Sequence, residues 1–283
     1  VTKVDRQRAS YEDLKGFRRI TKNDRLRGCG LRRIAVQVTL AAPTGGDIGR
    51  ALGIARCGCG WLCPVCSVVI RTRRASELAE ALDRWTAAGN SLYMLTLTLP
   101  HNLFDTLESS FDDLLKAWTK LRQNRRFRHL RKAMRESGYV RAVEITWSET
   151  NGWHPHLHIL LLVPGDLTEA QGAAIKAETF PMWESAVTSL GRRAPTFEHG
   201  IHVRIGDAAA GDYVLKIQDG FDAAAELTLT HLKKGRRESL SAFAIGRLAA
   251  AGSARHRVLW REYETVTKGR KAIEPSPSFR ASL

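Results

Sequence analysis

The sequence predicts an α+β fold in which helices pack on a central antiparallel sheet, beside a small cysteine-rich module near the N-terminus. Two β-rich segments, residues 139–150 and 154–163, flank an Asn-Gly pair, which is a strong hairpin signal. Segments with helical periodicity occur before and after this pair. Four of the five cysteines lie within residues 57–66, so they form a local cluster rather than a distributed disulfide framework.

Before the hairpin, the elements follow from periodicity and from glycine and proline. Residues 34–40 predict a short strand, and residues 42–53 form a loop rich in glycine and proline. Residues 67–88 have helical spacing and end at Gly-Asn. Residues 91–99 are apolar or β-branched and predict a strand that Pro100 ends.

Two helices precede the hairpin, an amphipathic one at 104–122 and a very basic one at 125–137. After the hairpin we expect a helix at 167–190, a strand at 200–205 and a short helix at 208–218. Beyond residue 220 the pattern is helical and basic without clear limits. The charged first 25 residues and the tail from Glu274 are expected to order only on binding a partner. These boundaries predict three regions: a basic N-terminal region with the cysteine module (1–88), a central domain (89–220) and a basic, mainly helical C-terminal region (221–283).

The charge indicates a polyanionic partner. The 283 residues include 44 Lys and Arg against 29 Asp and Glu, which gives a net charge of +15 and a pI near 10.1. Nucleic acid is the leading candidate, and an anionic membrane is the alternative. No apolar run of about 18 residues occurs, and the first ten residues are too charged for a signal peptide. We therefore expect a cytoplasmic protein without a membrane partner.

The hairpin carries the clearest candidate metal site. In an extended strand His156 and His158 point to one face while Leu157 and Ile159 point to the other. Two imidazoles on one face can chelate a divalent ion. The polar faces of the two strands must coincide, and a loop of residues 151–153 would place Thr146 opposite His158. Glu144, diagonal to His158 in that register, is the predicted third ligand.

Two imidazoles and a carboxylate suit Mn²⁺, with Mg²⁺ and Zn²⁺ as alternatives. His154, Thr96 and Thr98 are predicted to support the ligands without binding the metal themselves. His101 and His202 can approach the site as structural groups or DNA contacts. The alternative for the whole motif is that the histidines only decorate a solvated strand face.

The cysteine cluster predicts a structural zinc site. The predicted ligands are Cys57, Cys59, Cys63 and Cys66, of which the last two form a Cys-Pro-Val-Cys knuckle. Such a closed site organises a module and performs no chemistry. Free thiols or a redox pair at Cys63 and Cys66 are alternatives, and Cys29 is a possible substitute for one ligand.

Three motifs resemble those of one enzyme family. The His-Leu-His of residues 156–158 resembles the histidine-hydrophobic-histidine signature of the HUH endonucleases, and His-Pro-His-Leu-His (154–158) resembles its form in rolling-circle replication initiators of small bacterial plasmids. Residues 95–101 are similar to the family's first motif, and Tyr213-Val-Leu-Lys216 to its third, the nucleophile helix. The motifs occur in the family's order within residues 90–220, and the resemblance implies an HUH-type palm.

The resemblance implies an enzyme that nicks and joins single-stranded origin DNA, including hairpin DNA, through a 5′-phosphotyrosine. Tyr213 would be the nucleophile, and Lys216, three residues along the same helical face, would stabilise the developing negative charge. A host helicase and polymerase would be partners, in the bacterial cytoplasm. A glutamate that some relatives carry one turn before the tyrosine is Ala209 here. A single-tyrosine transposase or relaxase, a non-covalent metal phosphoesterase and a non-catalytic zinc-containing DNA-binding regulator are the alternatives.

Basic runs on both sides of the proposed site predict phosphate contacts, although such runs are also typical of solvated helix faces. The residues chosen as DNA-binding are Arg71, Arg73, Arg74, Arg125, Arg126, Arg128, Lys233 and Lys234.

Overall fold

The computed structural model describes residues 3–41, 50–206 and 239–280 of the chain. These residues form two compact units. The sheet unit comprises residues 73–206, 239–241 and 269–280, and the cysteine unit comprises residues 3–41, 50–72 and 242–268. Helix α3 (Pro64–Ala87) runs from one unit into the other.

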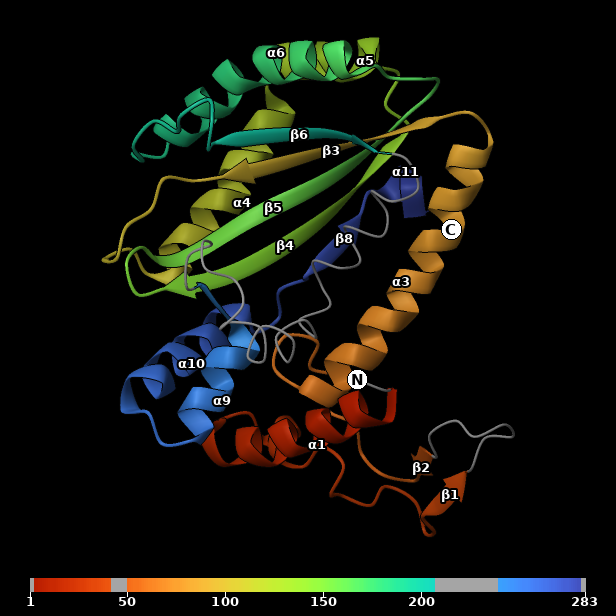
Figure 1. Ribbon diagram of the computed structural model, residues 1–283, viewed down its shortest axis with the longest axis vertical. Helices are drawn as coiled ribbons and strands as arrows, with labels where there is room; N and C mark the ends of the chain where they lie inside the picture. The colour runs from red at the N-terminus through yellow and green to blue at the C-terminus, as the bar shows by residue number, and fades with distance from the viewer. Residues whose placement is uncertain (1–2, 42–49, 207–238, 281–283) are drawn as a thin grey trace. The chain divides into compact units, whose positions relative to one another are not determined.

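The sheet unit contains a six-stranded antiparallel sheet (Figure 1). Five strands follow the order β6-β3-β5-β4-β7, and β8 pairs with another part of β4. The bounds are β3 Ser91–Thr98, β4 Gly138–Ser148, β5 Gly152–Val163, β6 Ile201–Gly206, β7 Ser239–Ser241 and β8 Ile273–Pro275. The predicted α+β class with a central antiparallel sheet is confirmed.

The β4–β5 hairpin differs from the predicted register by four residues along β5. Ser148 pairs with Gly152, so Thr146 lies opposite His154 rather than opposite His158. The turn occupies residues 149–151 because Gly152 already begins β5, with φ of 72°. A Cβ at Gly152 would lie 3.1 Å from the backbone of Asn102 and of Leu103. The shift is even, so each side chain keeps its predicted face.

One face of the sheet is apolar at one end. Leu92 and Met94 of β3, Leu160 and Leu162 of β5 and Val140 of β4 share this face, because their strands pair in register. They form a core with Leu78, Ala81 and Leu82 of α3 and with Ile273 and Phe279. The second half of α3 therefore covers this end of the face, and the histidines lie on the same face beyond the core that α3 forms.

The opposite face is covered by helices α4 (Leu107–Gln123) and α6 (Glu169–Thr188), and α4 passes behind β3 and β5 in Figure 1. Thr106 caps α4, and Thr168 with Gln171 forms a capping box on α6. The small Gly172 of α6 allows close packing on Val203 and Ile205 of β6. The basic helix α5 (Arg125–Ala133) follows α4.

The cysteine unit joins N-terminal residues of the chain to residues 242–268. It contains α1 (Lys3–Ile20), α2 (Asp24–Arg27), α9 (Ala242–Ala250), α10 (Ala254–Thr267) and a ribbon of β1 (Thr39–Ala41) and β2 (Arg50–Leu52). The ring of Phe17 lies 4.7 Å from that of Trp260 and 6.0 Å from that of Phe243. The carboxylate of Glu264 on α10 accepts hydrogen bonds from the backbone amides of Lys22 and Asn23 at 3.1 and 3.0 Å.

Three expectations about local order were wrong. Residues 3–20 form a helix whose Leu14 and Phe17 are fully buried, so this part of the N-terminal region orders without a partner. Residues 274–280 of the tail form the end of β8 and the short helix α11 (Pro277–Arg280). The strand predicted at 34–40 is only Thr39–Ala41, because bends interrupt residues 35–37. The helix predicted at 208–218 lies outside the described residues.

None of the helices in the described part of the chain is long and apolar enough to cross a bilayer.

We expect Leu82→Ala to lower the free energy of unfolding by about 2–5 kcal/mol, because Leu82 is 1% exposed between α3 and the sheet. The matched change on the same helix, Val69→Ala, removes a side chain that is 65% exposed and should cost under about 0.5 kcal/mol. Urea unfolding followed by tryptophan fluorescence measures both. Equal effects would contradict the packing of α3 described above.

Candidate metal centres

A carboxylate and two imidazoles meet on this sheet face, at the end beyond the core formed with α3. Glu144 of β4 lies directly opposite His156 of β5, and His158 is one step further along the same face. Glu144 Oε2 is 3.0 Å from His156 Nε2 and 3.2 Å from His158 Nε2. One donor atom from each residue lies within 4.8 Å of the other two. The structure therefore brings together the three residues that the sequence singled out as metal ligands.

The burial of this group is uneven. The His158 side chain is 4% exposed and that of His156 12%, whereas Glu144 retains 31%. The imidazoles are thus held within the sheet surface, and the carboxylate is the most accessible of the three groups. An ion bound here would have protein ligands on the sheet side and space for other ligands beside Glu144.

The protonation states suit a divalent cation. Burial alone would favour neutral Glu144, but the hydrogen bonds and charges of His156 and His158 hold the pKa of Glu144 well below its usual value. Burial lowers the pKa of His158. An ionised carboxylate beside a neutral imidazole is the combination that a metal requires, because only deprotonated donors bind it.

A hydroxyl holds the deeper imidazole. Thr96 of β3 pairs with His158, and its Oγ1 is 3.0 Å from His158 Nδ1. A hydroxyl can donate to or accept from this nitrogen, so it can fix the ring with or without a metal on Nε2. Thr98, opposite His156, instead donates its hydroxyl to the carbonyl of His199.

A second histidine pair lies next to the group. His154 shares the face of His156, and its Nδ1 contacts His101 Nε2 closely. His101 Nδ1 donates to the carbonyl of Asn151 at 2.9 Å. Burial, with the nearby His156 and His101, lowers the pKa of His154 to about 3. His101 is positioned directly after β3, and the prediction that it approaches this region agrees with its contact to His154.

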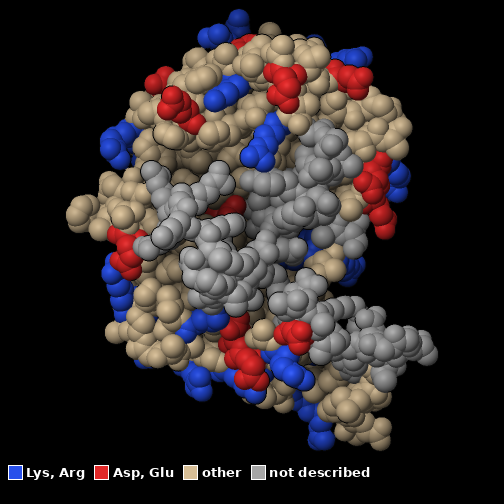
Figure 2. Space-filling view, viewed as in Figure 1, with Lys and Arg blue, Asp and Glu red and all other residues tan. Residues whose placement is uncertain are grey.

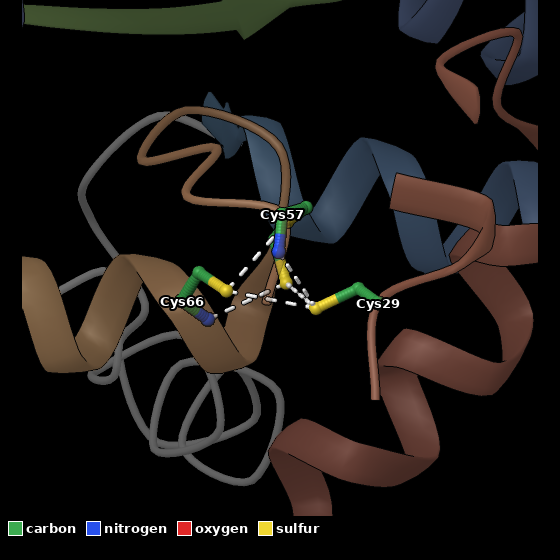
Figure 3. A group of neighbouring side chains, drawn as sticks. Cys29, Cys57 and Cys66 are labelled. Carbon is green, nitrogen blue, oxygen red and sulfur yellow. Dashed lines mark hydrogen bonds between the residues drawn. The ribbon is translucent and has the colours of Figure 1, made fainter. Parts of the chain in front are cut away.

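A second candidate metal centre consists of four buried cysteines in the cysteine unit. Cys29, Cys57, Cys63 and Cys66 each offer a sulfur within 4.8 Å of the others. Figure 3 shows the thiols of Cys29, Cys57 and Cys66 turned toward one another. Cys29 lies in the loop after α2, Cys57 in the loop after β2 and Cys66 at the start of α3. Sulfur separations are 3.8 Å for Cys29–Cys63 and 3.6 Å for both Cys29–Cys66 and Cys57–Cys66.

These separations fit tetrahedral zinc. With Zn–S near 2.3 Å, the edges of a tetrahedron are about 3.8 Å, whereas a disulfide requires about 2.05 Å. Backbone amides also point at the sulfurs: Cys57 N donates to Cys29 Sγ at 3.4 Å and Cys66 N to Cys63 Sγ at 3.3 Å. Such hydrogen bonds favour the thiolate form that binds zinc.

The fourth sulfur is Cys29 rather than the predicted Cys59. The backbone of residues 30–33 pairs with that of residues 54 and 55. Gly30 N donates to Ala55 O and Ala55 N donates to Arg32 O, each at 2.8 Å. This pairing places Cys29 beside Cys57. Gly58, with φ of 65°, turns the chain so that Cys59 leaves the group. The Cys59 thiol instead lies 3.7 Å from Asn23 Nδ2.

The predicted DNA-binding residues fall into separate groups. Arg125, Arg126 and Arg128 are exposed on α5. Arg73 is exposed and pairs with Glu77 at 2.8 Å, Arg74 is exposed, and Arg71 lies over the ring of Phe243. In the upper part of Figure 2, where α5 and α6 lie, Lys and Arg side chains are interspersed with Asp and Glu and form no continuous patch.

Four predicted site residues lie outside the described residues: Tyr213, Lys216, Lys233 and Lys234. Their roles stay predictions.

Comparison with known proteins finds a matching family. Residues 54–190, which include Glu144, His156 and His158, match the model of a family described as replication protein. The family resemblance drawn from the motifs is confirmed over this range.

Three relatives are similar over different lengths. A Streptomyces lividans protein named protein rep is 29% identical, over 86% of this chain and 67% of its own length. A Streptomyces cyanogenus protein named neomycin resistance protein is 31% identical over 60% of this chain and 47% of its own length, and a Lentilactobacillus hilgardii protein rep is 28% identical over 44% and 40%. The chain thus spans less than half of two of these relatives. No solved structure matches the chain.

We expect Thr96→Val to weaken Mn²⁺ binding by about 10–100-fold, because valine keeps the shape but removes the hydroxyl that holds His158 Nδ1. Thr98→Val is the matched control, since its hydroxyl contacts a backbone carbonyl instead. Isothermal titration of each variant with Mn²⁺ gives the affinities. Equal losses in both variants would contradict the orienting role of Thr96.

Cys29→Ser should lose bound zinc, whereas Cys59→Ser should retain one equivalent, because Cys29 Sγ and not Cys59 Sγ completes the sulfur tetrahedron. Metal content after purification by mass spectrometry, with thermal unfolding of each variant, measures the difference. Zinc loss in Cys59→Ser with retention in Cys29→Ser would reverse this assignment.

Proposed function

We propose that this chain is an HUH-type endonuclease that nicks single-stranded DNA at a plasmid origin and rejoins it, so that rolling-circle replication can begin. The observation that carries the proposal is the group of Glu144, His156 and His158 within the part of the chain that matches the replication protein family. Two of the relatives are named protein rep, which agrees with this proposal.

The proposed chemistry has a metal-assisted and a covalent part. A Mn²⁺ or Mg²⁺ ion at Glu144, His156 and His158 would polarise the scissile phosphate. The Tyr213 hydroxyl then attacks phosphorus, and the bond from phosphorus to the 3′ oxygen breaks. The tyrosine proton passes by way of solvent to the leaving 3′ oxygen, which becomes a free hydroxyl, and the 5′ phosphate stays on Tyr213. Attack by a 3′ hydroxyl reverses these steps and rejoins the strand.

Each residue has a distinct task in this scheme. Glu144 is the accessible carboxylate that completes the metal ligands, while Thr96 and the sheet hold His158 in place. Lys216 supplies a cation for the developing phenolate. A zinc ion held by Cys29, Cys57, Cys63 and Cys66 would be structural, because four protein sulfurs leave no position for substrate.

The proposed partners are origin DNA, single-stranded or folded as a hairpin, and the host helicase and polymerase that extend the released 3′ hydroxyl. Phosphate contacts by Arg73, Arg74 and the exposed arginines of α5 would make binding fall steeply with salt. The bacterial cytoplasm is the proposed location.

The chain incubated with Mn²⁺ and labelled single-stranded oligonucleotides from the adjoining origin should form a protein–DNA band that survives denaturing electrophoresis. Tyr213→Phe should abolish the band, because it removes the attacking oxygen, and His158→Ala should lower its yield by at least about 100-fold, because it removes a metal ligand.

Two results would overturn this proposal. Cleavage that persists in Tyr213→Phe indicates hydrolysis by a metal-activated water without a covalent step. Tight origin binding without cleavage by the parent chain indicates a regulator. Tyr263→Phe is a control for the tyrosine change, since Tyr263 is buried in the cysteine unit.

A further inference from the structure

The strand on one side of the metal group carries an arginine and a histidine. Strand β6 lies at one edge of the sheet, next to β3, and pairs His202 with Thr96 and Arg204 with Met94. Because Thr96 in turn pairs with His158, His202 and Arg204 project from the same face as the metal ligands. Both are exposed.

The spacing of this strand from the metal group suits neighbouring phosphates. Adjacent strands are about 4.8 Å apart, so β6 lies roughly 10 Å from β5, with β3 between them. An arginine side chain can cover much of this distance while its stem lies along the sheet. Burial, together with the charges of Lys176, His199 and Arg204, lowers the pKa of His202, so Arg204 is the charged group of this pair near neutral pH.

The other side of the group is different in chemistry. Strand β7 pairs Ser241 with Thr146 and Ser239 with Ser148 of β4, so hydroxyls share the metal-binding face there. Among the described residues of the two flanking strands on this face, the permanent cation, Arg204, is on β6 and the neutral hydroxyls are on β7. Within these two strands, a phosphate chain crossing the sheet would therefore meet positive charge on the β6 side.

We propose that Arg204, with His202 beside it, binds a phosphate of the DNA strand on the β6 side of the scissile phosphate and so sets the direction in which the strand crosses the sheet. The guanidinium is permanently charged and can bind two phosphate oxygens at once, which makes it the stronger contact of the two. The inference rests on the proposed function, because it assigns a contact within the same DNA site.

The first test measures only the binding of DNA by the chain, by fluorescence anisotropy with a labelled oligo-dT of about 20 nucleotides at several salt concentrations. Arg204→Ala should raise Kd about five- to tenfold at 100 mM salt and reduce the slope of log K against log salt by about 0.7, the loss of one phosphate contact on a single strand. Arg204→Lys should restore most of the slope but not the full affinity. Arg84→Ala, an exposed arginine on α3, is the matched control and should match the parent.

The second test measures direction, with an origin oligonucleotide that the parent cleaves. In this oligonucleotide, single phosphates are replaced one at a time by a neutral methylphosphonate. The replacement should weaken binding by the parent chain only at positions on one side of the cleavage site. Arg204→Ala should be insensitive to the same replacement, because the contact is already lost.

The outcomes separate the two claims. An Arg204→Ala variant that binds oligo-dT like Arg84→Ala overturns the inference, even if the parent forms the covalent product. Failure of the parent to form that product with any oligonucleotide overturns the proposed function, while the oligo-dT measurement still decides the role of Arg204. Retained circular dichroism and thermal midpoint in Arg204→Ala exclude misfolding as the cause of weaker binding.

Discussion

The pairing of β4 with β5 is the constraint on which the candidate active site depends. It places the Glu144 carboxylate within 3.2 Å of both imidazoles. A slip of one residue would send Glu144 to the helix-covered face, and a slip of two would move it to face His154 or His158. The close approach of Gly152 to the backbone of Asn102 and Leu103 limits such slips at the turn. Strand β5 also has β3 on its other side, so both of its edges are fixed.

Along the same pair of strands, one sheet face changes from an apolar core at one end to the candidate metal ligands at the other. Along β5 the residues of this face change from Leu162 and Leu160 to His158 and His156. The leucines lie under α3, where their burial stabilises the sheet, and the histidines lie beyond it. The candidate metal ligands are thus carried by a strand whose other end is anchored in the core, which helps to keep the imidazoles in place.

The features predicted correctly depend on local patterns. Alternation along two strands was enough to assign His156, His158 and Glu144 to one face, because the period of a strand is two. The register was not predicted correctly, since the Asn-Gly pair is compatible with more than one loop length. Cys29 was predicted only as an alternative ligand, because its approach depends on pairing between residues 30–33 and 54–55, distant in sequence. Helix α1 was missed because its charged composition conceals Leu14 and Phe17, which are buried; Phe17 packs against α9 and α10, more than 220 residues away.

The most direct test of this account is to locate a bound metal. Crystals of the chain soaked in Mn²⁺ should show an anomalous peak within about 2.0–2.3 Å of His156 Nε2, His158 Nε2 and a Glu144 oxygen. Zinc should appear as a separate peak among Cys29, Cys57, Cys63 and Cys66. A manganese peak elsewhere on the sheet unit, or none at this group in crystals that bind the ion at other positions, would contradict the central claim that these three side chains form the metal centre.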